Sequence, residues 1–424
     1  MPPVHVACTE AEVRPVRALV VRAYDEARAR RWPFLSDVLE GVLRGVGEEE
    51  RAVVAAAVQA LVKYDRLVGF ACGSQDAEAR VDALFALASG ATELGPRLAR
   101  IEGATERLGV AYSLPDWLVD LVRGEVGEAS LEAGLARMNE PPARVARVNT
   151  LHATREACLA ALVEEGVEAR PTAHAAAGLV FGGRRSVFRT KAFARGELEM
   201  QDEASQLVAE LVAPPPKSFV VDACAGAGGK TLALAALLGG KGKVVALDTS
   251  EDKLEELRRR ARRAGASNVQ ALALDVREPG SALADMEGRA SRVLVDAPCT
   301  GLGAIRRNPE ARWRLKQDDL SRLVAAQAAL VKAAARLVTP GGRLVYATCS
   351  FLPSEGEVAV DFFLGERPDF TLVTARDVLG RARTEGVATA DRKYLRTWRF
   401  DGTRDGGDEG MDGFFGAVMR RAKG

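Results

Sequence analysis

Two cysteines of this chain lie where a thiol could be presented to a substrate. Cys349 follows the apolar run 342–348, and Cys299 follows the apolar run 292–298. A thiolate is a strong nucleophile that forms covalent intermediates, so a cysteine just beyond a strand can attack a substrate carbon. The alternative is that each cysteine is a small buried hydrophobic residue, which is the usual state of a free cysteine.

The stretch around Cys299 combines several chemically active side chains. Residues 296–314 read DAPCTGLGAIRRNPEARWR, so Asp296 and Pro298 leave the strand together with the cysteine, and four arginines follow. A strand that ends in a Pro-Gly turn and continues as a basic, solvated loop would need no chemistry. A carboxylate, a thiol and four guanidinium groups within nineteen residues favour a site instead.

Histidine and cysteine usage narrows the chemistry. The three histidines are His5, His152 and His174, so none lies in the second half of the chain and imidazole is not the base there. The six cysteines are scattered without a C-x-x-C pair, which excludes the usual zinc spacings and is typical of a reduced compartment. We therefore expect no metal and a cytoplasmic location.

A glycine-rich loop lies upstream of both cysteines. Residues 222–231 read DACAGAGGKT, in which Asp222 ends an apolar run and three glycines precede a helix. Glycines let backbone amides approach a ligand closely, and a helix N-terminus favours an anionic group. A phosphate-binding loop of the type G-x-x-x-x-G-K-[ST] would need glycine at position 224, which is Cys224, so an NTPase is disfavoured.

Two aspartates end the next two predicted strands. Asp248 ends the run 243–248 and Asp275 ends the run 269–275. A carboxylate at the first position can accept both ribose hydroxyls, and one at the second can meet an adenine amino group. Each alone is more often a turn or cap residue, but together with the glycine loop they predict a pocket for an adenosine-bearing cofactor. No basic residue adjoins Asp248, which argues against a 2′-phosphate.

The elements that must position these residues alternate between strands and helices. Continuous apolar runs separated by helical segments predict an α/β fold with a largely parallel, doubly wound sheet, in which ligands bind at the carboxyl ends of the strands. The predicted strands are 218–223, 243–248, 269–275, 292–298 and 342–348, with two later candidates at 394–400 and 413–421.

The first half of the chain reads differently. Residues 1 to about 135 carry apolar side chains at three- and four-residue spacing, which predicts a helical bundle without a catalytic cluster. One of its helices is expected over 112–122. A strand at 146–151, a helix at 155–166 and a β-rich piece over 179–183 and 186–205 predict a small α+β insert. We therefore predict domains at 1–140, 141–210 and 211–424.

Charge and hydropathy argue against an overall polyanion-binding surface, a signal peptide and a membrane span. Lys plus Arg (59) nearly balance Asp plus Glu (58), so any site for a polyanion must be a local patch. The interrupted apolar residues at the start of the chain do not read as a signal peptide. No uncharged apolar run reaches the length of about 18 residues that a membrane span needs.

Several of these stretches occur together in one known family. The glycine loop, QDEAS (201–205), DAPCTGLGAIRRNP (296–309) and YATCS (346–350) resemble motifs of the Sun/RsmB family of S-adenosylmethionine-dependent RNA cytosine-5 methyltransferases. RVNTL (147–151) and DGFFGAVMRR resemble the flanking motifs of the same family. The resemblance implies a Rossmann-like methyltransferase sheet with an all-α, NusB-like, RNA-binding N-terminal domain and a small α+β linking domain.

The resemblance also assigns roles. It implies that Cys349 is the nucleophile, that Cys299 assists product release, that Asp296 meets N3 of the base, and that Lys230 steadies the pocket and lowers a thiol pKa. S-adenosylmethionine would be held by the loop and the strand-end carboxylates, which are Cys224, Ala225, Gly226, Ala227, Gly228, Gly229, Lys230, Asp248, Asp275 and Asp296.

The loop departs from the family pattern C-A-A-P-G-G-K-T. Gly226 stands where alanine is usual and Ala227 where proline is usual. Proline fixes its own φ, so a loop without it is expected to be less stiff.

The expected partner is RNA, most simply 16S rRNA of the small subunit before assembly, acted on by a monomer. Arg306 and Arg307, which flank the cysteine loop, are the expected RNA contacts, whereas the arginine-rich helix 257–265 is more simply a solvated face. Alternatives are the same chemistry on tRNA or another rRNA, or a noncatalytic RNA-binding or assembly factor. An amino-methyltransferase would show [DN]-P-P-[YF] at residue 296, and a dithiol redox protein would not need the adenosine pocket.

Overall fold

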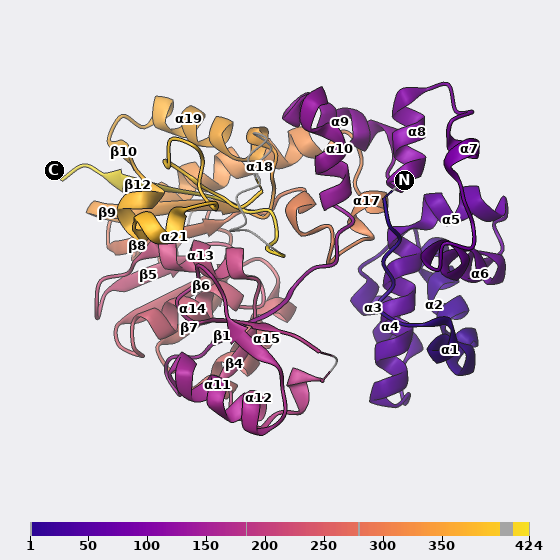
Figure 1. Ribbon diagram of the computed structural model, residues 1–424. Coiled ribbons are helices and arrows are strands. Elements are labelled where there is room, and N and C mark those ends of the chain that lie inside the picture. The colour runs from indigo at the N-terminus through magenta and orange to yellow at the C-terminus, as the bar shows by residue number, and fades with distance from the viewer. Residues whose placement is uncertain (1, 184, 279, 399–409, 424) are drawn as a thin grey trace. The chain divides into compact units, whose positions relative to one another are not determined.

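The chain is described from a computed structural model that covers residues 2–183, 185–278, 280–398 and 410–423 (Figure 1). Two compact units are present. Of the described residues, one unit contains 2–141 together with Ala304–Leu320, and the other contains those of Pro142–Gly303 together with 321–398 and 410–423. The segment after the DAPC motif is therefore part of the first unit, although the motif itself belongs to the second.

The first unit is helical, as the apolar spacing predicts. In α4 (Glu48–Lys63) the buried side chains of Val54, Val58 and Leu61 recur at three- and four-residue spacing and face the core of the unit. The other helices of this unit are α1 (Glu10–Val13), α2 (Arg17–Ala29), α3 (Leu35–Val42), α5 (Asp65–Cys72), α6 (Ala77–Ala88), α7 (Gly95–Leu98), α8 (Ala104–Ala111), α9 (Asp116–Val126), α10 (Glu128–Arg137) and α17 (Ala311–Arg314).

The small sheet of the second unit has four antiparallel strands in the order β2-β3-β1-β4. Its strands are β1 (Arg144–Val148), β2 (Ala169–Pro171), β3 (Gly178–Phe181) and β4 (Leu198–Met200), and its helices are α11 (Arg155–Glu164) and α12 (Lys191–Ala194). The strand expected over 146–151 ends early because the side chain of Asn149 turns the chain by accepting from the Leu151 N–H at 3.2 Å.

The β-rich piece expected over 179–183 and 186–205 is right at its first part, which forms β3, and wrong in part over 186–205. A 3₁₀ turn (Val187–Arg189) and α12 precede β4, and α13 (Glu203–Val212) follows it. Short polar side chains cap both helices: the Phe193 N–H donates to Thr190 at 3.1 Å and the Ala204 N–H donates to Asp202 at 2.9 Å. These caps satisfy helix N–H groups that a strand would have paired with a neighbour.

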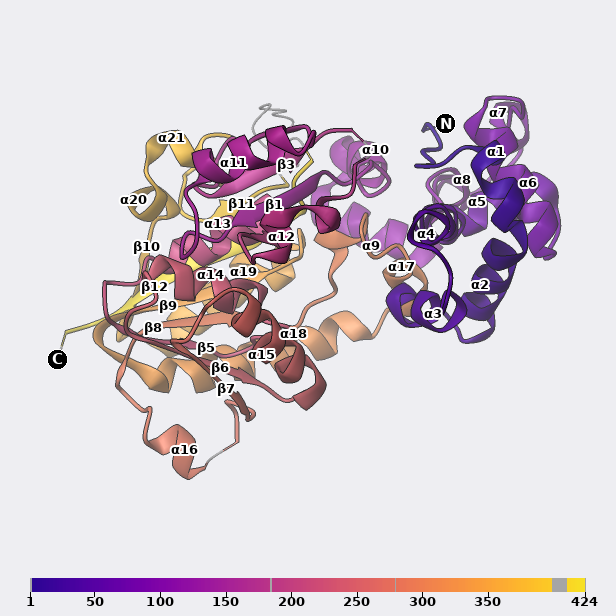
Figure 2. The ribbon, with the colours of Figure 1, turned by 90° about the horizontal axis from the view of Figure 1, so that it is seen from below.

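The large sheet confirms the doubly wound, Rossmann-like prediction. Its order is β10-β12-β9-β8-β5-β6-β7, and the strand labels follow this order in Figure 2. Strands β5 to β9 are parallel, whereas β12 runs antiparallel to β9. The strands are β5 (Phe219–Asp222), β6 (Lys243–Asp248), β7 (Val269–Ala273), β8 (Ala290–Asp296), β9 (Val338–Thr348), β10 (Phe370–Val373) and β12 (Phe415–Arg421), with β11 (Leu395–Arg396) paired to β12.

The chain order reverses beside β5. The strands β6 and β7 follow β5 on one side, and β8 and β9 lie on the other. Ligands of such sheets bind at the carboxyl ends next to this reversal. The predicted site residues leave the sheet at that position.

Helices cover both faces of the large sheet. Val220 of β5 packs among residues of α13 and α14, while the adjacent Val221 packs among residues of α18 and α19, as the alternation of side chains along a strand requires. The helices are α14 (Gly229–Leu237), α15 (Glu251–Arg263), α16 (Ser281–Ala284), α18 (Asp319–Ala334), α19 (Glu357–Glu366), α20 (Ala375–Leu379) and α21 (Arg381–Thr384).

Three predicted elements have bounds that differ from those in the structure. Asp275 lies two residues beyond the end of β7. Only Leu395–Arg396 of the strand candidate 394–400 forms a strand, and residues 399 and 400 lie outside the described residues. The helix expected over 112–122 begins at Asp116, because Ser113 has a left-handed φ of 54° and turns the chain before it.

Among the residues that the structure describes, no helix combines the length and apolar character needed to cross a bilayer.

Candidate active site

The two strand-end cysteines meet. β8 and β9 are adjacent and parallel, with Asp296 paired to Ala347, so Cys299 and Cys349 leave the sheet at the same edge. Their sulfur atoms are 3.3 Å apart and both residues are partly exposed. The Gly303 N–H donates to the carbonyl of Cys349 at 3.0 Å, which ties one loop to the other.

The environment of Cys299 favours its protonated thiol. The hydrogen bond with Cys349, and then burial, raise the pKa of Cys299 well above its ordinary value. The protonated Cys299 can donate its S–H to the sulfur of Cys349.

A buried ion pair adjoins the sulfurs. The ammonium of Lys230, in the first turn of α14, donates to Asp296 at 2.7 Å and lies 4.9 Å from the ring centre of Phe414. Burial opposes the charge of Lys230, but the carboxylate of Asp296 and the sulfur of Cys349 outweigh it and raise the lysine pKa. A permanent cation at this position stabilises a nearby thiolate.

A pocket of about 250 Å³ opens beside this pair at the carboxyl ends of the strands. Five of the predicted cofactor-binding residues line it, namely Cys224, Gly226, Asp248, Asp275 and Asp296. The other lining residues are Ala223, Thr249, Lys253, Leu274, Val276, Arg277, Pro298 and Leu330.

The carboxylates of the pocket have defined partners. Asp248 accepts from the Gly226 N–H at 2.8 Å and from the Ser250 N–H at 2.9 Å. Asp275 forms an ion pair with Arg277 at 2.5 Å, and this hydrogen bond lowers the pKa of Asp275. Sequence reasoning missed Arg277, although its position two residues after Asp275 is a signal for such a pair.

Cys224 lines the pocket as a neutral thiol. Burial is the largest cause that raises the pKa of Cys224, and the surrounding carboxylates are the next. A thiol in an acidic, buried environment is a poor nucleophile. Cys224 therefore contributes shape and apolar contact, whereas Cys349 has an ammonium nearby.

The remaining loop residues form the turn behind the pocket. The Ala225 N–H donates to the carbonyl of Leu247 at 2.9 Å. Gly228 has a φ of 86°, and a Cβ there would lie 2.6 Å from Leu257, so only glycine fits. Gly229 is the first residue of α14, and Ala227, Gly228 and Lys230 do not line the pocket itself.

The loop that lacks the family proline is braced by an arginine from α15. Arg260 donates to the carbonyl of Ala227 at 2.7 Å and to the buried carboxylate of Glu199 at 2.9 Å. Arg263 also pairs with Glu199. The arginine-rich helix is thus only partly the solvated face expected, since Arg260 joins the loop to Glu199 of β4 and Arg263 holds the helix to the same glutamate.

A buried glutamate joins the two cysteine loops. Glu355 is fully buried and accepts from the Thr300 N–H at 2.9 Å, from the Thr300 hydroxyl at 2.5 Å and from Gln327 at 2.9 Å. Gln327 also donates to the carbonyl of Pro298 at 3.0 Å. Thr300 follows Cys299 directly and Glu355 follows Cys349 by six residues, so this network positions both sulfurs.

The arginines expected to contact RNA lie in the first unit. Arg306 is only 3% exposed and pairs with Glu140 at 3.9 Å, so it is not available to a phosphate. Arg307 is half-buried. Arg312 is fully buried and donates to the carbonyls of Lys63, Ser113 and Met138 and to the side chain of Asn139.

The chain is similar to known methyltransferases of ribosomal RNA. A family model described as "16S rRNA methyltransferase RsmB/F" matches residues 209–420, and a model of the ferredoxin-like domain of RsmF/B-like methyltransferases matches residues 114–187. A probable ribosomal RNA small subunit methyltransferase B of Synechocystis is 35% identical over 62% of this chain and 59% of its own length. The ribosomal RNA small subunit methyltransferase B of Vibrio cholerae is 32% identical over 75% of this chain and 68% of its own length.

Solved structures share the fold. The crystal structure of the protein PH0851 matches with a TM-score of 0.78 and 25% identity, covering 98% of this chain and all of that one. The chain spans about three fifths of the length of the Synechocystis relative and of the corresponding Bacillus subtilis protein, at 59% and 61%.

Proposed function

The chain belongs to the 16S rRNA methyltransferase RsmB/F family, and from this membership we propose that it transfers a methyl group from S-adenosylmethionine to C5 of a cytosine in small-subunit rRNA. The observation that carries the proposal is the pair of sulfurs 3.3 Å apart, beside an ammonium–carboxylate pair and a pocket at the carboxyl edge of the sheet. We also propose that residues 1–140 bind RNA and that 141–210 link this region to the methyltransferase domain 211–424.

The pocket residues fit S-adenosylmethionine by charge and by place. The cofactor carries a sulfonium and an ammonium, and Asp248, Asp275 and Asp296 line the pocket. Asp248 lies at the end of β6, where a carboxylate accepts ribose hydroxyls, and Asp275 lies at the next position along the edge. When bound, the cofactor supplies an electrophilic methyl group.

Cys349 activates the base in this proposal. C5 of cytosine is a weak nucleophile, and addition of the Cys349 thiolate to C6 makes C5 electron-rich. The cationic Lys230 stabilises the thiolate, and Cys299 can donate its S–H to it before the attack. An S–C6 bond forms, the electron pair at C5 takes the methyl group, and the cofactor would leave as S-adenosylhomocysteine. A base then removes the C5 proton, so that the C5–C6 double bond forms again while the S–C6 bond breaks and the Cys349 thiolate is returned.

Asp296 acts in the first step of this reaction, and Cys299 acts in the last. Charge develops at N3 when the thiolate adds, and Asp296 can meet it only as the protonated acid. The ammonium of Lys230 lies 2.7 Å from the same carboxyl group. Cys299 lies beside the S–C bond that must break and assists product release.

Transfer to defined RNAs tests the proposal. The full chain is incubated with methyl-labelled cofactor and, in parallel, with protein-free 16S rRNA, 23S rRNA and tRNA, and digested nucleosides are identified by mass spectrometry. We expect 5-methylcytidine in 16S rRNA and none with Cys349→Ser. Label in tRNA or 23S rRNA instead would reassign the substrate, and no transfer to any RNA would favour a noncatalytic binding factor.

A further inference from the structure

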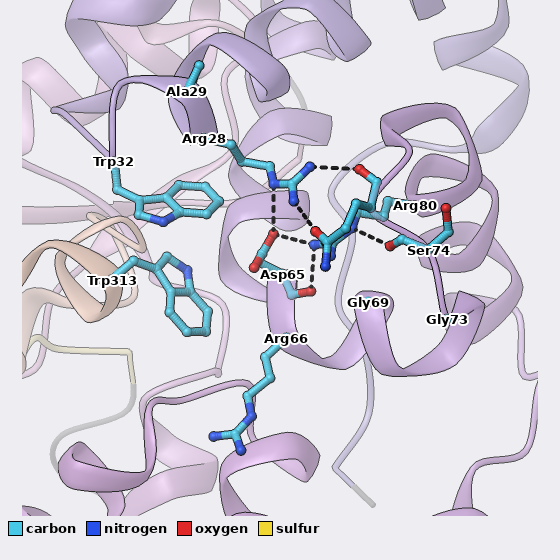
Figure 3. Close-up of a pocket in the computed structure, with 11 residues that line it drawn as sticks. Arg28, Ala29, Trp32, Asp65, Arg66, Gly69, Gly73, Ser74, Arg80 and Trp313 are labelled. Carbon is cyan, nitrogen blue, oxygen red and sulfur yellow. Dashed lines mark hydrogen bonds and ion pairs between the residues drawn. The ribbon is translucent and has the colours of Figure 1, made fainter.

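A second pocket, of about 830 Å³, lies within the helical unit and plays no part in the chemistry above. It is lined by Arg28, Ala29, Trp32, Asp65, Arg66, Gly69, Gly73, Ser74, Gln75, Arg80 and Trp313 (Figure 3). Its volume is in the range of pockets that hold a small organic group, roughly 300–1,000 Å³.

Two indole rings form one wall of this pocket. Trp32 and Trp313 have ring centres 6.1 Å apart and an interplanar angle of 35°, and both are only partly buried. Figure 3 shows both rings projecting toward the arginine–aspartate cluster on the opposite side. Large aromatic surface left open to water is costly unless a ligand covers it.

The backbone presents Trp32 at an energetic cost. Arg31 and Trp32 have φ values of 59° and 63°, a left-handed conformation that is uncommon for residues other than glycine. These two residues turn the chain after α2 and direct the indole back toward the cluster (Figure 3). Strained residues of this kind concentrate at binding sites.

Trp313 is held by its edge. Its indole N–H donates to the carbonyl of Val62 at 2.7 Å, and the adjacent Arg312 is buried in the same unit. Anchoring of α17 would by itself explain why a tryptophan stands at position 313. It does not account for Trp32, whose ring packs on Trp313 and Tyr24 without a hydrogen bond that fixes it among the described residues.

The polar side of the pocket is basic. Three arginines and one aspartate among the lining residues give a formal charge of +2, while the whole chain has a net charge of +1. Arg80 and Arg28 are engaged by Asp65 and Gln75. Arg66 donates through one nitrogen to Leu114 and Asp116, and its guanidinium lies apart from that network in Figure 3.

Asp65 adds a hydrogen-bond acceptor to the arginine cluster of the pocket. Its Oδ1 atom receives hydrogen bonds from Tyr24 at 2.5 Å and Arg80 at 2.6 Å. Its Oδ2 atom receives no hydrogen bond from the described residues. A carboxylate oxygen in this position accepts from an amino or imino group of a base edge.

We propose that this pocket binds one unpaired nucleotide of the RNA substrate. The base stacks against the Trp32–Trp313 pair, its amino or imino edge meets Asp65, and its phosphate lies near Arg66 and Arg28. Indole stacking combined with arginines is the chemistry by which proteins hold single-stranded RNA. An apolar peptide fits less well, because the rest of the lining, apart from Ala29, consists of glycine, serine, glutamine and charged residues. This inference rests on the proposed RNA substrate.

Binding of a labelled oligonucleotide tests the inference with the full chain. The probe is a fluorescein-labelled single-stranded RNA decamer of mixed sequence, compared with its duplex, and affinity is measured by anisotropy at fixed salt. Loss of one base–aromatic contact is expected to weaken binding of the single strand about tenfold in Trp32→Ala. Trp32→Phe keeps a stacking ring and should stay within about threefold of the unmodified chain.

Two arginine variants give a matched comparison. Arg66→Gln should weaken single-strand binding and reduce its salt dependence, because one phosphate contact is lost. Arg44→Gln removes an exposed arginine of the same unit outside the pocket and should leave affinity unchanged. Duplex affinity should not respond to Trp32→Ala.

The outcomes separate this inference from the proposed function. The pocket inference is wrong if the unmodified chain methylates RNA but Trp32→Ala and the unmodified chain bind the decamer with equal affinity. The pocket would then suit a peptide. If the unmodified chain methylates no RNA, a tenfold loss in Trp32→Ala still supports the pocket. Equal loss for the duplex, or loss in Trp32→Phe as large as in Trp32→Ala, would overturn the assignment to an unpaired, stacked base.

Discussion

Removal of the Arg260 side chain should weaken cofactor binding without touching the cofactor pocket. The guanidinium bridges the carbonyl of Ala227 at 2.7 Å and the carboxylate of Glu199 at 2.9 Å, and it is 18% exposed. It therefore substitutes for the stiffness that proline gives this loop in the family pattern. Arg260→Ala should let the loop sample conformations in which Gly226 and Cys224 no longer line the pocket.

The size of the effect follows from the bond that is lost. A hydrogen bond from a charged donor contributes about 1.5–3 kcal/mol, and partial exposure places this one near the lower end. A loss of about 1.5 kcal/mol corresponds to roughly a tenfold increase in Kd. We expect that increase in the Kd of S-adenosylhomocysteine by calorimetry and in the KM of S-adenosylmethionine.

Arg259 provides the matched control on the same helix. Its side chain is 70% exposed and pairs with Glu256 at 2.7 Å, so Arg259→Ala should change binding by less than about twofold. Ala227→Pro should restore much of the affinity in the Arg260→Ala background, because the Ala227 N–H donates no hydrogen bond within the described part of the chain. Unchanged cofactor affinity in Arg260→Ala would refute the bracing role.

Other predictions concern the buried polar groups of the site. Glu355→Gln replaces one acceptor oxygen by a donor facing Thr300 or Gln327, so urea unfolding should show a loss of roughly 2 kcal/mol and kcat should fall; equal stability would contradict the network. Burial raises the pKa of Asp222 to about 7. Between pH 5 and 7 the folded state then holds a proton that the unfolded state has lost, so this carboxyl lowers stability as pH rises. Asp222→Asn should gain stability relative to the unmodified chain over that interval, by roughly 2 kcal/mol, and a constant difference would refute the assignment. Lys230→Met should lower kcat about a hundredfold and move the pH midpoint of Cys349 alkylation upward, measured with iodoacetamide and mass spectrometry in a Cys299→Ala background; an unmoved midpoint would exclude thiolate stabilisation by Lys230.

Much of the sheet follows from local sequence patterns. Continuous apolar runs mark β5, β6, β8 and β9, and parallel neighbours bring their carboxyl ends to one edge, so the meeting of Cys299 and Cys349 is predictable once the runs are identified. Where the predicted bounds of an element are wrong, a single polar side chain caps a helix or turns the chain. Thr190 and Asn149 are examples whose effect on the local backbone outweighs the strand preference of their neighbours.

The residues that sequence reasoning missed act through distant partners. Glu355 bonds to Thr300 across 55 positions, and Arg260 pairs with Glu199 across 61 positions, so neither contact has a local signature. Arg312 looks like part of a basic loop in sequence. It is buried because carbonyl groups of Lys63 and Ser113, 249 and 199 positions away, accept its hydrogen bonds.

The central claim is that Cys349 forms a covalent bond to the base and that Cys299 is needed for release. The most direct measurement is denaturing electrophoresis of Cys299→Ala after incubation with 16S rRNA and S-adenosylmethionine. We expect a protein–RNA adduct that survives denaturation and is absent when Cys349 is also replaced by alanine. Methyl transfer that persists without Cys349, together with no adduct in Cys299→Ala, would contradict it.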